Sequence, residues 1–285
     1  MMRLAVVVAL ASCLVAVSAQ AQHEHLSEDE LAKQLSNPIS SIWSLQLQNN
    51  LTMMRGSGHS YRGKFTSNFQ PAMPLPLTED WNLILRPVFN FTDTPYFDSS
   101  GDLDRTSGIG QTSIIALISP QKSKFLWGLG PTAIIPTTTR DELSQRKYSL
   151  GPAAVALKMT EKWVFGLFPQ YWWSISGSDR RENVSQANIQ YFAWRSFGDG
   201  WQVGAAPNIT YNRKASGPNA WEVPIGIGVQ KTEKFGKLPI RFTFETHYYA
   251  IHTDDFGARW NFRFAITPVI PALIKNPLFG SKKPK

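Results

Sequence analysis

The sequence predicts an all-β fold, a transmembrane antiparallel up-and-down β-barrel of about twelve strands with a short N-terminal periplasmic helix. Three observations predict it. About twelve segments alternate apolar and polar residues, as strands with two different faces do. The connections alternate between short turns and long loops, as in barrels with a periplasmic and an outer side. The chain is also rich in aromatic residues, with ten Trp, eight Tyr and seventeen Phe, and the Trp recur at segment ends.

Residues 1–21 are typical of a cleaved signal peptide. A positive start, "MMR", precedes an apolar stretch and the small-x-small site Ala19-Gln20-Ala21. "LASC" would instead allow lipoprotein processing at Cys13, but the apolar run continues past it, which favours cleavage after Ala21. The mature chain then lacks cysteine, because the sequence has only one. Beyond the signal, no apolar run has the length of a membrane helix.

Residues 22–41 form a predicted periplasmic segment with a short helix. Ser27 and Glu30 have the spacing of a capping box, and Asn37-Pro38 ends the helical pattern. We expect this helix to lie outside the lipid, with both chain ends periplasmic.

The barrel is predicted over residues 42–271, followed by a tail at 272–285. Its strands are expected at 43–52, 64–73, 81–91, 108–118, 125–135, 149–157, 163–173, 187–196, 201–211, 221–229, 240–249 and 260–266. A soluble sandwich or propeller also alternates, but it would turn the apolar rows inward. In a membrane barrel the apolar rows face lipid and the polar rows face a lumen.

The net charge of +8 does not indicate nucleic-acid binding. The basic residues are scattered among acidic ones, as in "RDELSQRK", and part of the excess is the tail "GSKKPK". A solvated mixture of charges is the simpler interpretation. The expected partners are outer-membrane lipid and a small solute of unknown identity, and the sequence does not indicate an oligomeric state.

The chain resembles a family of bacterial outer-membrane proteins. The resemblance is carried by "ELAKQLSNPISSIWSLQLQNN", "FQPAMPLPLTEDWNLILRPVF", "SLGPAAVAL", "WEVPIGIGVQKTEKFGKLPIRFTFETHYY" and "WNFRFAITPVIP". The family is labelled MetA-pathway-of-phenol-degradation or putative transporter, and some members are mislabelled neuromedin U. The resemblance implies an outer-membrane barrel of a Gram-negative cell. The tail departs from the pattern, since "ALIKNPLFGSKKPK" runs past the expected closure.

Seven residues on inward rows are candidate lumen-lining or constriction residues: Arg86, Gln170, Trp172, Arg241, Glu245, His247 and Arg263. Glu245 and His247 lie two apart on one face, where Arg241 and Arg263 are expected nearby. A constriction would bias which solutes pass. The alternative, an ion-pair network that fills a narrow lumen, is favoured because buried charges must be paired.

Four aromatic residues open strands after short turns and are predicted to form a membrane girdle: Trp81, Phe125, Trp163 and Trp201. Each is followed six residues later by a proline of the outward row, at Pro87, Pro131, Pro169 and Pro207. The shared spacing predicts a partial proline ring at one height of the barrel. Because proline has no N–H, we expect a bulge or a locally widened ladder there.

The expected function is passive passage of small, hydrophobic or aromatic molecules, the substrate class being implied by the family name alone. The alternative is a closed, non-conducting barrel with an envelope structural or sensing role. A lipid-modifying enzyme is less favoured, since no outward row contains a His. No cofactor is implied, and the pair His23 and His25 on a chain end is a weak metal candidate.

Overall fold

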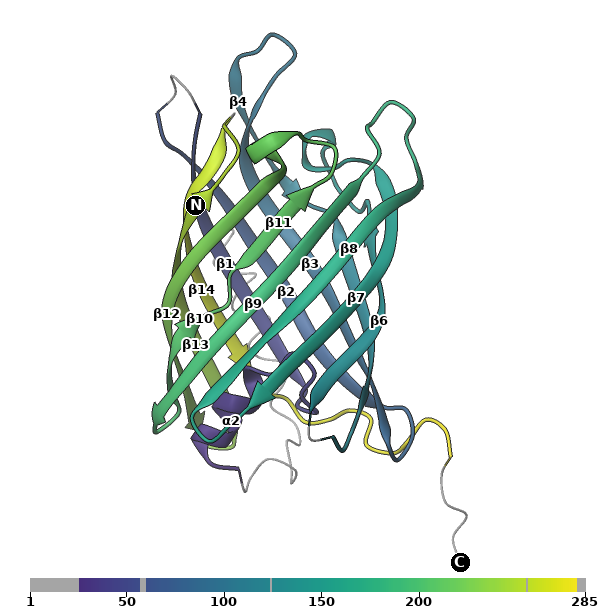
Figure 1. Cartoon of the computed structure of the whole chain (residues 1–285), viewed down its shortest axis with the longest axis vertical. Coiled ribbons are helices and arrows are strands. Elements are labelled where there is room, and N and C mark those ends of the chain that lie inside the picture. The colour runs from purple at the N-terminus through teal and green to yellow at the C-terminus, as the bar shows by residue number, and fades with distance from the viewer. Residues whose placement is uncertain (1–25, 57–59, 124, 255, 281–285) are drawn as a thin grey trace, which may run out of the picture.

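The computed structural model describes residues 26–56, 60–123, 125–254 and 256–280 (Figure 1). Its strands wind around one axis and close into a barrel, inclined to that axis as barrel closure requires. The signal peptide, Cys13 and the pair at 23 and 25 lie outside the described residues.

The structure contains one α-helix, two short 3-10 helices and fourteen strands within the described residues. Their bounds are α2 Glu28–Leu35, β1 Ser44–Arg55, β2 Arg62–Pro76, β3 Trp81–Phe97, β4 Leu103–Ile109, β5 Thr112–Pro120, β6 Leu126–Ile135, η1 Asp141–Leu143, β7 Lys147–Met159, β8 Trp163–Gly177, β9 Ser185–Gly198, β10 Trp201–Ala205, β11 Asn208–Asn212, η2 Gly217–Ala220, β12 Trp221–Phe235, β13 Leu238–Ile251 and β14 Gly257–Pro268.

The barrel has twelve strand positions, as predicted, because two positions are each split into two strands. β4 and β5 both pair with β3, and β10 and β11 both lie between β9 and β12. All pairings are antiparallel, and β1 pairs with β14 to close the barrel. Closure leaves no free sheet edge.

Short turns at the end of the barrel that carries α2 (the α2 end) use the same chemistry twice. In "LTEDW" the Thr78 hydroxyl accepts from the backbone N–H groups of Asp80 and Trp81, both at 3.2 Å. In "MTEKW" the Thr160 hydroxyl accepts from the N–H of Trp163 at 3.0 Å. A side-chain acceptor that fixes a tight turn also fixes the register of the hairpin.

The outside of the barrel is apolar, as the alternating rows predict. Large apolar side chains at least one third exposed recur on nearly every strand, among them Leu47, Phe69, Phe89, Leu129, Leu167, Val203, Ile225, Ile227, Phe244 and Phe264. Soluble monomers rarely expose contiguous apolar surface on this scale. The outward rows are therefore suited to lipid.

The inward rows, predicted to be polar with aromatic residues such as Phe168 and Trp172 among them, are apolar along about half of the barrel. Strands β3, β5, β7, β8 and β9 turn apolar side chains inward, and these form one buried cluster: Ile84, Ile115, Leu117, Val155, Leu157, Val164, Phe168, Phe192 and Trp194. Polar inward side chains gather on β10 and β12–β14. Side chains that meet across a narrow barrel exclude water, so an apolar inward row is stable where it finds apolar partners.

Helix α2 begins with the predicted capping box. The Glu30 N–H donates to the Ser27 hydroxyl, and the Ser27 N–H donates to the Glu30 carboxylate at 2.8 Å. Leu31 and Ala32 are fully buried against the mouth of the barrel. Within the described ranges no helix is long and apolar enough to cross a membrane.

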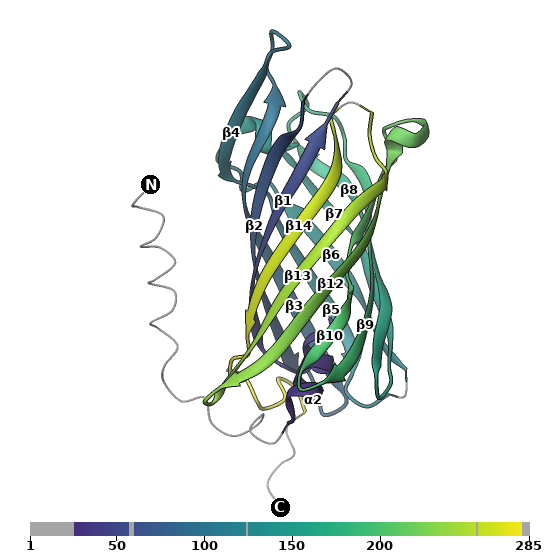
Figure 2. The same ribbon diagram turned by 90° about the vertical axis from the view of Figure 1, so that its left-hand side faces the viewer.

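Polar contacts tie the helix to the short turns around the mouth. Asp29 accepts from the N–H of Gly200 at 2.7 Å, and the Lys33 ammonium donates to the carbonyl of Glu161 at 2.9 Å. Glu28 accepts from the N–H of Lys234 at 3.2 Å. Figure 2 shows α2 lying across the α2 end, opposite the end from which β4 projects (the β4 end).

The tail after β14 lies at the same end as α2 (Figure 1). Its backbone extends the contacts of the first strands, since the N–H of Ile270 donates to Trp43 and that of Leu278 to Pro76, each at 2.9 Å. Both described ends of the chain therefore lie on one side of the barrel, as predicted.

The four predicted prolines interrupt the ladder without shifting its register. Pairing stops and resumes in the same register between these pairs: Phe69–Phe89 and Met73–Leu85 beside Pro87, Ile115–Thr132 and Ile118–Leu129 beside Pro131, Ala153–Gln170 and Ala156–Leu167 beside Pro169, and Ala205–Ala193 and Asn208–Gln190 beside Pro207. A bulge would add a residue to one strand. The prediction of a bulge at these prolines is wrong, and the interrupted pairing is consistent with the alternative, a locally widened ladder.

The prolines also share a height. From Pro87 the paired residues lead around the barrel to Ala133, Trp173 and, through Ser185, Arg213. The other three prolines precede these level residues by two, four and six positions. Because the strands are tilted, a line drawn through successive paired residues climbs about 6 Å along the barrel axis for every two strands. Each further proline lies two more residues back along its strand, which lowers it by about 5 Å. The displacements nearly cancel, which confirms the ring.

Pro207 departs from the predicted lipid-facing row. Pro131 and Pro169 are exposed and Pro87 is half-buried, but Pro207 is buried. The reason lies in the preceding residue, Ala206, whose backbone groups bond to side chains inside the barrel and draw the chain inward between β10 and β11.

Candidate functional site in the barrel interior

The polar half of the interior is organised around the Glu245 carboxylate on β13. One oxygen accepts from Arg263 on β14 at 3.1 Å, and the other lies 3.0 Å from Nε2 of His247. The three side chains are at most 7% exposed. The sequence left two interpretations of these residues, a selective constriction and an ion-pair network that fills the lumen, and favoured the network. The ion pair between Glu245 and Arg263 agrees with the network.

The interruption between β10 and β11 supplies the remaining partners of this cluster. The Ala206 N–H donates to the second Glu245 oxygen at 2.7 Å, and the Ala206 carbonyl accepts from Arg263 at 2.9 Å. Gln190 also donates to that carbonyl at 3.2 Å. In a regular strand the N–H and C=O of Ala206 would form hydrogen bonds with neighbouring strands. Here they form hydrogen bonds with charged side chains instead.

Both ring nitrogens of His247 have hydrogen-bond partners. Its Nδ1 accepts from the Asn261 amide at 3.2 Å, so Nε2 carries the hydrogen that Glu245 accepts. The Asn261 amide orientation follows from its other bonds, since its oxygen accepts from Thr52 at 3.0 Å and its nitrogen donates to Asn50 at 3.3 Å. The chain of donors and acceptors fixes one tautomer.

Two of the predicted residues face the apolar half. Trp172 on β8 is 6% exposed and donates through Nε1 to the Thr132 hydroxyl on β6 at 3.1 Å. Gln170, on the same inward row, is 8% exposed, and Phe168 below it is 3% exposed. The inward placement of Phe168 and Trp172 is as predicted.

The chain after α2 enters the barrel, which the sequence did not reveal. Ser36 donates to Gln202 at 3.0 Å and accepts from Gln230 at 2.8 Å, both inward residues of the wall. Ile39 joins the interior apolar cluster. Gly128 on β6 leaves the space for it, because an added Cβ would lie 3.3 Å from the Ile39 methyl. We call residues 26–43 the N-terminal plug.

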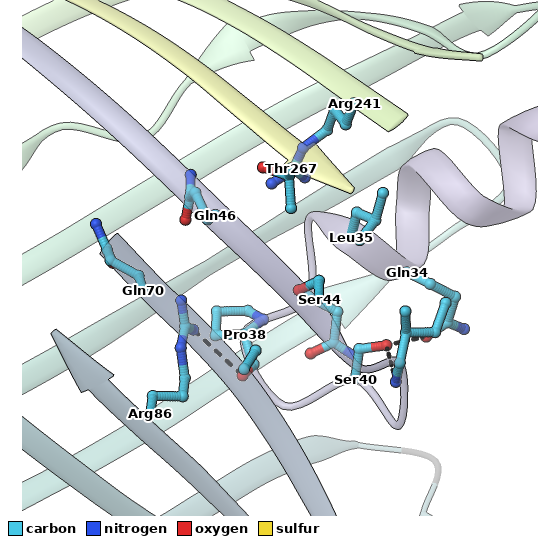
Figure 3. A pocket seen from close by; sticks show the side chains of 13 residues that line it. Gln34, Leu35, Pro38, Ser40, Ser44, Gln46, Gln70, Arg86, Arg241 and Thr267 are labelled. Atoms are coloured by element: carbon cyan, nitrogen blue, oxygen red, sulfur yellow. Dashed lines mark hydrogen bonds between the residues drawn. The ribbon is translucent and has the colours of Figure 1, made fainter. Parts of the chain in front are cut away.

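Arg86 and Arg241 lie beside the plug rather than in the Glu245 cluster. Arg86 donates to the carbonyl of Pro38 at 3.3 Å (Figure 3), and Arg241 donates to the Ser36 hydroxyl at 3.5 Å. Arg241 is close enough to Glu245 to feel its charge, as expected, but its hydrogen bond goes to the plug. The two residues are four apart on β13, and the inward row carries them to different levels of the lumen.

The four candidate girdle residues lie at the strand starts of the α2 end. Phe125, Trp163 and Trp201 are 55%, 42% and 47% exposed, and Trp81 is half-buried. Arg195 lies 5.8 Å from the Trp163 ring, and Lys231 lies 5.7 Å from the Trp201 ring. Aromatic rings beside cationic groups are typical of a membrane–water interface. The positions of these four residues agree with a membrane girdle, which stays a prediction.

Within the described ranges, no group of three or more His, Cys, Asp or Glu side chains is placed to hold an ion. His247, the His of the inward row, is already bonded to Glu245 and Asn261.

Comparison with known proteins relates this chain to others by fold. No protein-family model matches the chain, and no curated protein matches it. Among solved structures, it is similar to the COG4313 outer membrane channel of Pseudomonas putida F1, with a TM-score of 0.58 and 14% identity over 80% of this chain and 94% of that one.

Two further solved barrels are more distant. The transport unit of the autotransporter AIDA-I from Escherichia coli has a TM-score of 0.43 at 8% identity, over 87% of this chain and 99% of that one. The toluene transporter TodX of Pseudomonas putida has a TM-score of 0.42 at 7% identity, over 84% and 93%. The first similarity supports the barrel fold, and the family name that the sequence suggested is not confirmed.

Proposed function

We propose that the protein is an outer-membrane barrel of a Gram-negative cell that allows small, hydrophobic or aromatic molecules to pass. The apolar outer surface and the closed ladder support a place in the lipid. Passage would be passive, down the concentration gradient of the solute.

The observation that carries this proposal is the division of the interior into two walls. Phe168, Phe192 and Trp194 belong to an apolar wall, and Glu245 and Arg263 belong to a polar one. A solute with an apolar body and a polar end would find partners on both sides of such a lumen. A water-filled pore for ions would not need the apolar wall.

Passage requires movement of the plug. Ile39 and Leu117 pack together in the lower interior, where Leu117 is fully buried. The plug is held by hydrogen bonds of Ser36 and α2, which can be exchanged for water, and by the packing of Leu31 and Ile42 with Val269 and of Ile39 in the interior cluster. The wall itself is fixed by the ladder. The plug is therefore the part that yields.

A closed barrel with an envelope structural or sensing role is the second candidate. The same packing of Ile39 within the apolar cluster favours it, because the lower lumen is filled by side chains. Lipid hydrolysis is less consistent with the structure. His247 lies inside the barrel at 2% exposure, away from the outer face where acyl chains would lie, so it cannot act as a base there.

Conductance and solute flux distinguish the two candidates. Refolded protein is placed in planar bilayers and in liposomes loaded with an aromatic solute that the lipid retains, such as benzenesulfonate, with loaded liposomes that lack the protein as control. Discrete conductance steps and solute efflux above the control are expected. An intact, heat-modifiable barrel that neither conducts nor releases solute would support the closed barrel instead.

A further inference from the structure

We propose that the seam between the N-terminal plug and the barrel wall binds a small oxyanion, a carboxylate or phosphate group, between the guanidinium groups of Arg86 and Arg241. The proposal goes beyond passage and does not depend on conductance.

A cavity of about 40 Å³ lies at this seam (Figure 3). The plug side is formed by Gln34, Leu35, Asn37, Pro38, Ser40 and Ile42, and the wall side includes Ser44, Gln46, Gln70, Arg86 and Arg241. A single water needs roughly 10–15 Å³ on this measure. The cavity therefore has room for about three waters, or for one group of carboxylate or phosphate size.

The lining of the cavity carries positive charge, from two arginines, and no acidic side chain. In the described part of the chain neither Arg86 nor Arg241 forms an ion pair, and Arg241 feels the positive charge of Arg86. Glu245 is the acid that attracts Arg241, but Arg263, His247 and Ala206 already occupy its oxygens. Two like charges inside a barrel call for an anion between them.

Unused donors also point to a ligand. Arg241 is 8% exposed, and its Nε has no hydrogen-bond partner. Thr267, 2% exposed and also lining the cavity, has an unpartnered hydroxyl. The bonds that the guanidinium groups do make are long, at 3.3 Å to the Pro38 carbonyl and 3.5 Å to Ser36. Buried polar groups are normally satisfied, and a carboxylate or phosphate accepts several such donors at once.

The donor chemistry selects the ligand class. Arginine presents a planar fork that matches the oxygens of a carboxylate or phosphate, and the amides of Gln46 and Gln70 can donate further bonds. A halide offers no separated oxygens to such a fork. Because plug and wall both contribute groups, a bound oxyanion would link them.

The test is thermal unfolding and calorimetric titration of the folded protein in detergent. The probes are sodium benzoate, sodium acetate and sodium phosphate, with sodium chloride at matched ionic strength as the control. Carboxylates or phosphate, or both, are expected to raise the unfolding temperature with concentration, while chloride does not. The benzoate, acetate and phosphate arms show which source of the oxyanion the cavity takes.

Arg241→Gln and Arg86→Gln are each expected to weaken binding roughly tenfold or more, because each removes a charged donor. Arg105→Gln is the matched control: it removes the same charge on β4, where Arg105 pairs with Asp93 at 2.7 Å. Arg241→Lys keeps the charge but loses the fork, and should bind with intermediate affinity.

Heat-modifiable migration on a gel confirms that each variant is folded. The proposal is overturned if none of the three oxyanions stabilises or titrates the unaltered protein more than chloride does. It is also overturned if folded Arg241→Gln binds as tightly as the unaltered chain. Conductance measured on the same preparations separates failure of this site from failure of the proposed passage.

Discussion

At the scale of single residues, Glu245 has the most demanding position in the barrel. Its carboxylate is 2% exposed and has three partners, Arg263, His247 and the N–H of Ala206. Removing one member of a buried pair leaves the other charge without compensation. The first role of Glu245 is therefore to stabilise the polar wall, whether or not it also contacts a solute.

Glu245→Gln is expected to lower the free energy of unfolding by about 3–5 kcal/mol, measured by urea unfolding in detergent or lipid. Glu233→Gln is the control, because Glu233 is exposed near the end of β12. The double variant Glu245→Gln with Arg263→Gln should lose less than the sum of the two single losses. Additive losses would show that the two charges do not depend on each other.

Glu30 gives the plug a dependence on pH. Hydrogen bonds from the backbone and side chain of Ser27 hold the pKa of Glu30 below its usual 4.5. A carboxyl group with a lowered folded pKa stabilises the fold above its unfolded pKa, and the contribution is lost as pH falls through the folded value. The capping box should therefore weaken below pH 4.5.

Amide exchange of residues 28–35, corrected for intrinsic rates, should show this loss as the pH is lowered below 4.5. Glu30→Gln keeps the capping box without a titrating group, so its protection should not follow the same step. Ser27→Ala should cost the helix about 1 kcal/mol at neutral pH. An identical pH response in the unaltered protein and in Glu30→Gln would contradict the assignment.

At the scale of elements, the prolines show how a closed barrel accommodates missing N–H groups. Beside Pro169 the β8–β9 ladder is continuous, and the interruption is on the β7 side alone. Beside Pro207 the pairing is interrupted toward both β9 and β12. Pro169 therefore interrupts the pairing on one side of β8, whereas Pro207 divides one strand position into β10 and β11.

Substitution of each proline by valine should separate these two cases. In Pro169→Val the new N–H faces β7 and should be protected from exchange, because the register across the gap is already correct. In Pro207→Val the new N–H should stay unprotected, because Ala206 remains bound to Glu245 and Arg263. Amide exchange of the two variants measures this, and equal protection at both positions would refute the distinction.

The plug is the element whose contacts decide whether the lumen is closed. Deletion of residues 26–41 removes Ser36 and Ile39 from the interior while leaving the strands intact. We expect a larger single-channel conductance than for the full chain, because side chains leave the lower lumen. Ile39→Ala should have a smaller effect in the same direction. Unchanged conductance after the deletion would show that the plug does not limit passage.

At the scale of the whole molecule, barrel closure creates neighbours that are remote in sequence. Arg263 and Ala206 are 57 positions apart, and Ser36 and Gln230 are 194 apart. Both pairs meet because the strands circle one lumen. The interior is consequently a set of local sites at different heights, with the Glu245 cluster above the seam that holds Arg86 and Arg241.

Much of this architecture was predictable because its causes are local. Alternation along a strand sets which side chains point outward, so Phe244 and Phe264 could be assigned to the outer face from the sequence. Turn residues such as Thr78 fix their own hairpins, and Ser27 with Glu30 fixes the start of α2. The spacing from Trp163 to Pro169, repeated in other hairpins, was enough to predict a shared height.

The sequence by itself determined the strands, their faces, the capping box and the proline ring, because each follows from residues a few positions apart. Tertiary structure alone decided what fills the lumen. Alternation shows that Val164 points inward but not that it meets an apolar wall, and nothing near Ile39 shows that it enters the barrel. Similarly, the inward turn of Ala206 depends on charges supplied by β13 and β14. These outcomes depend on which inward rows face each other across the closed barrel, and no pattern within one strand encodes that arrangement.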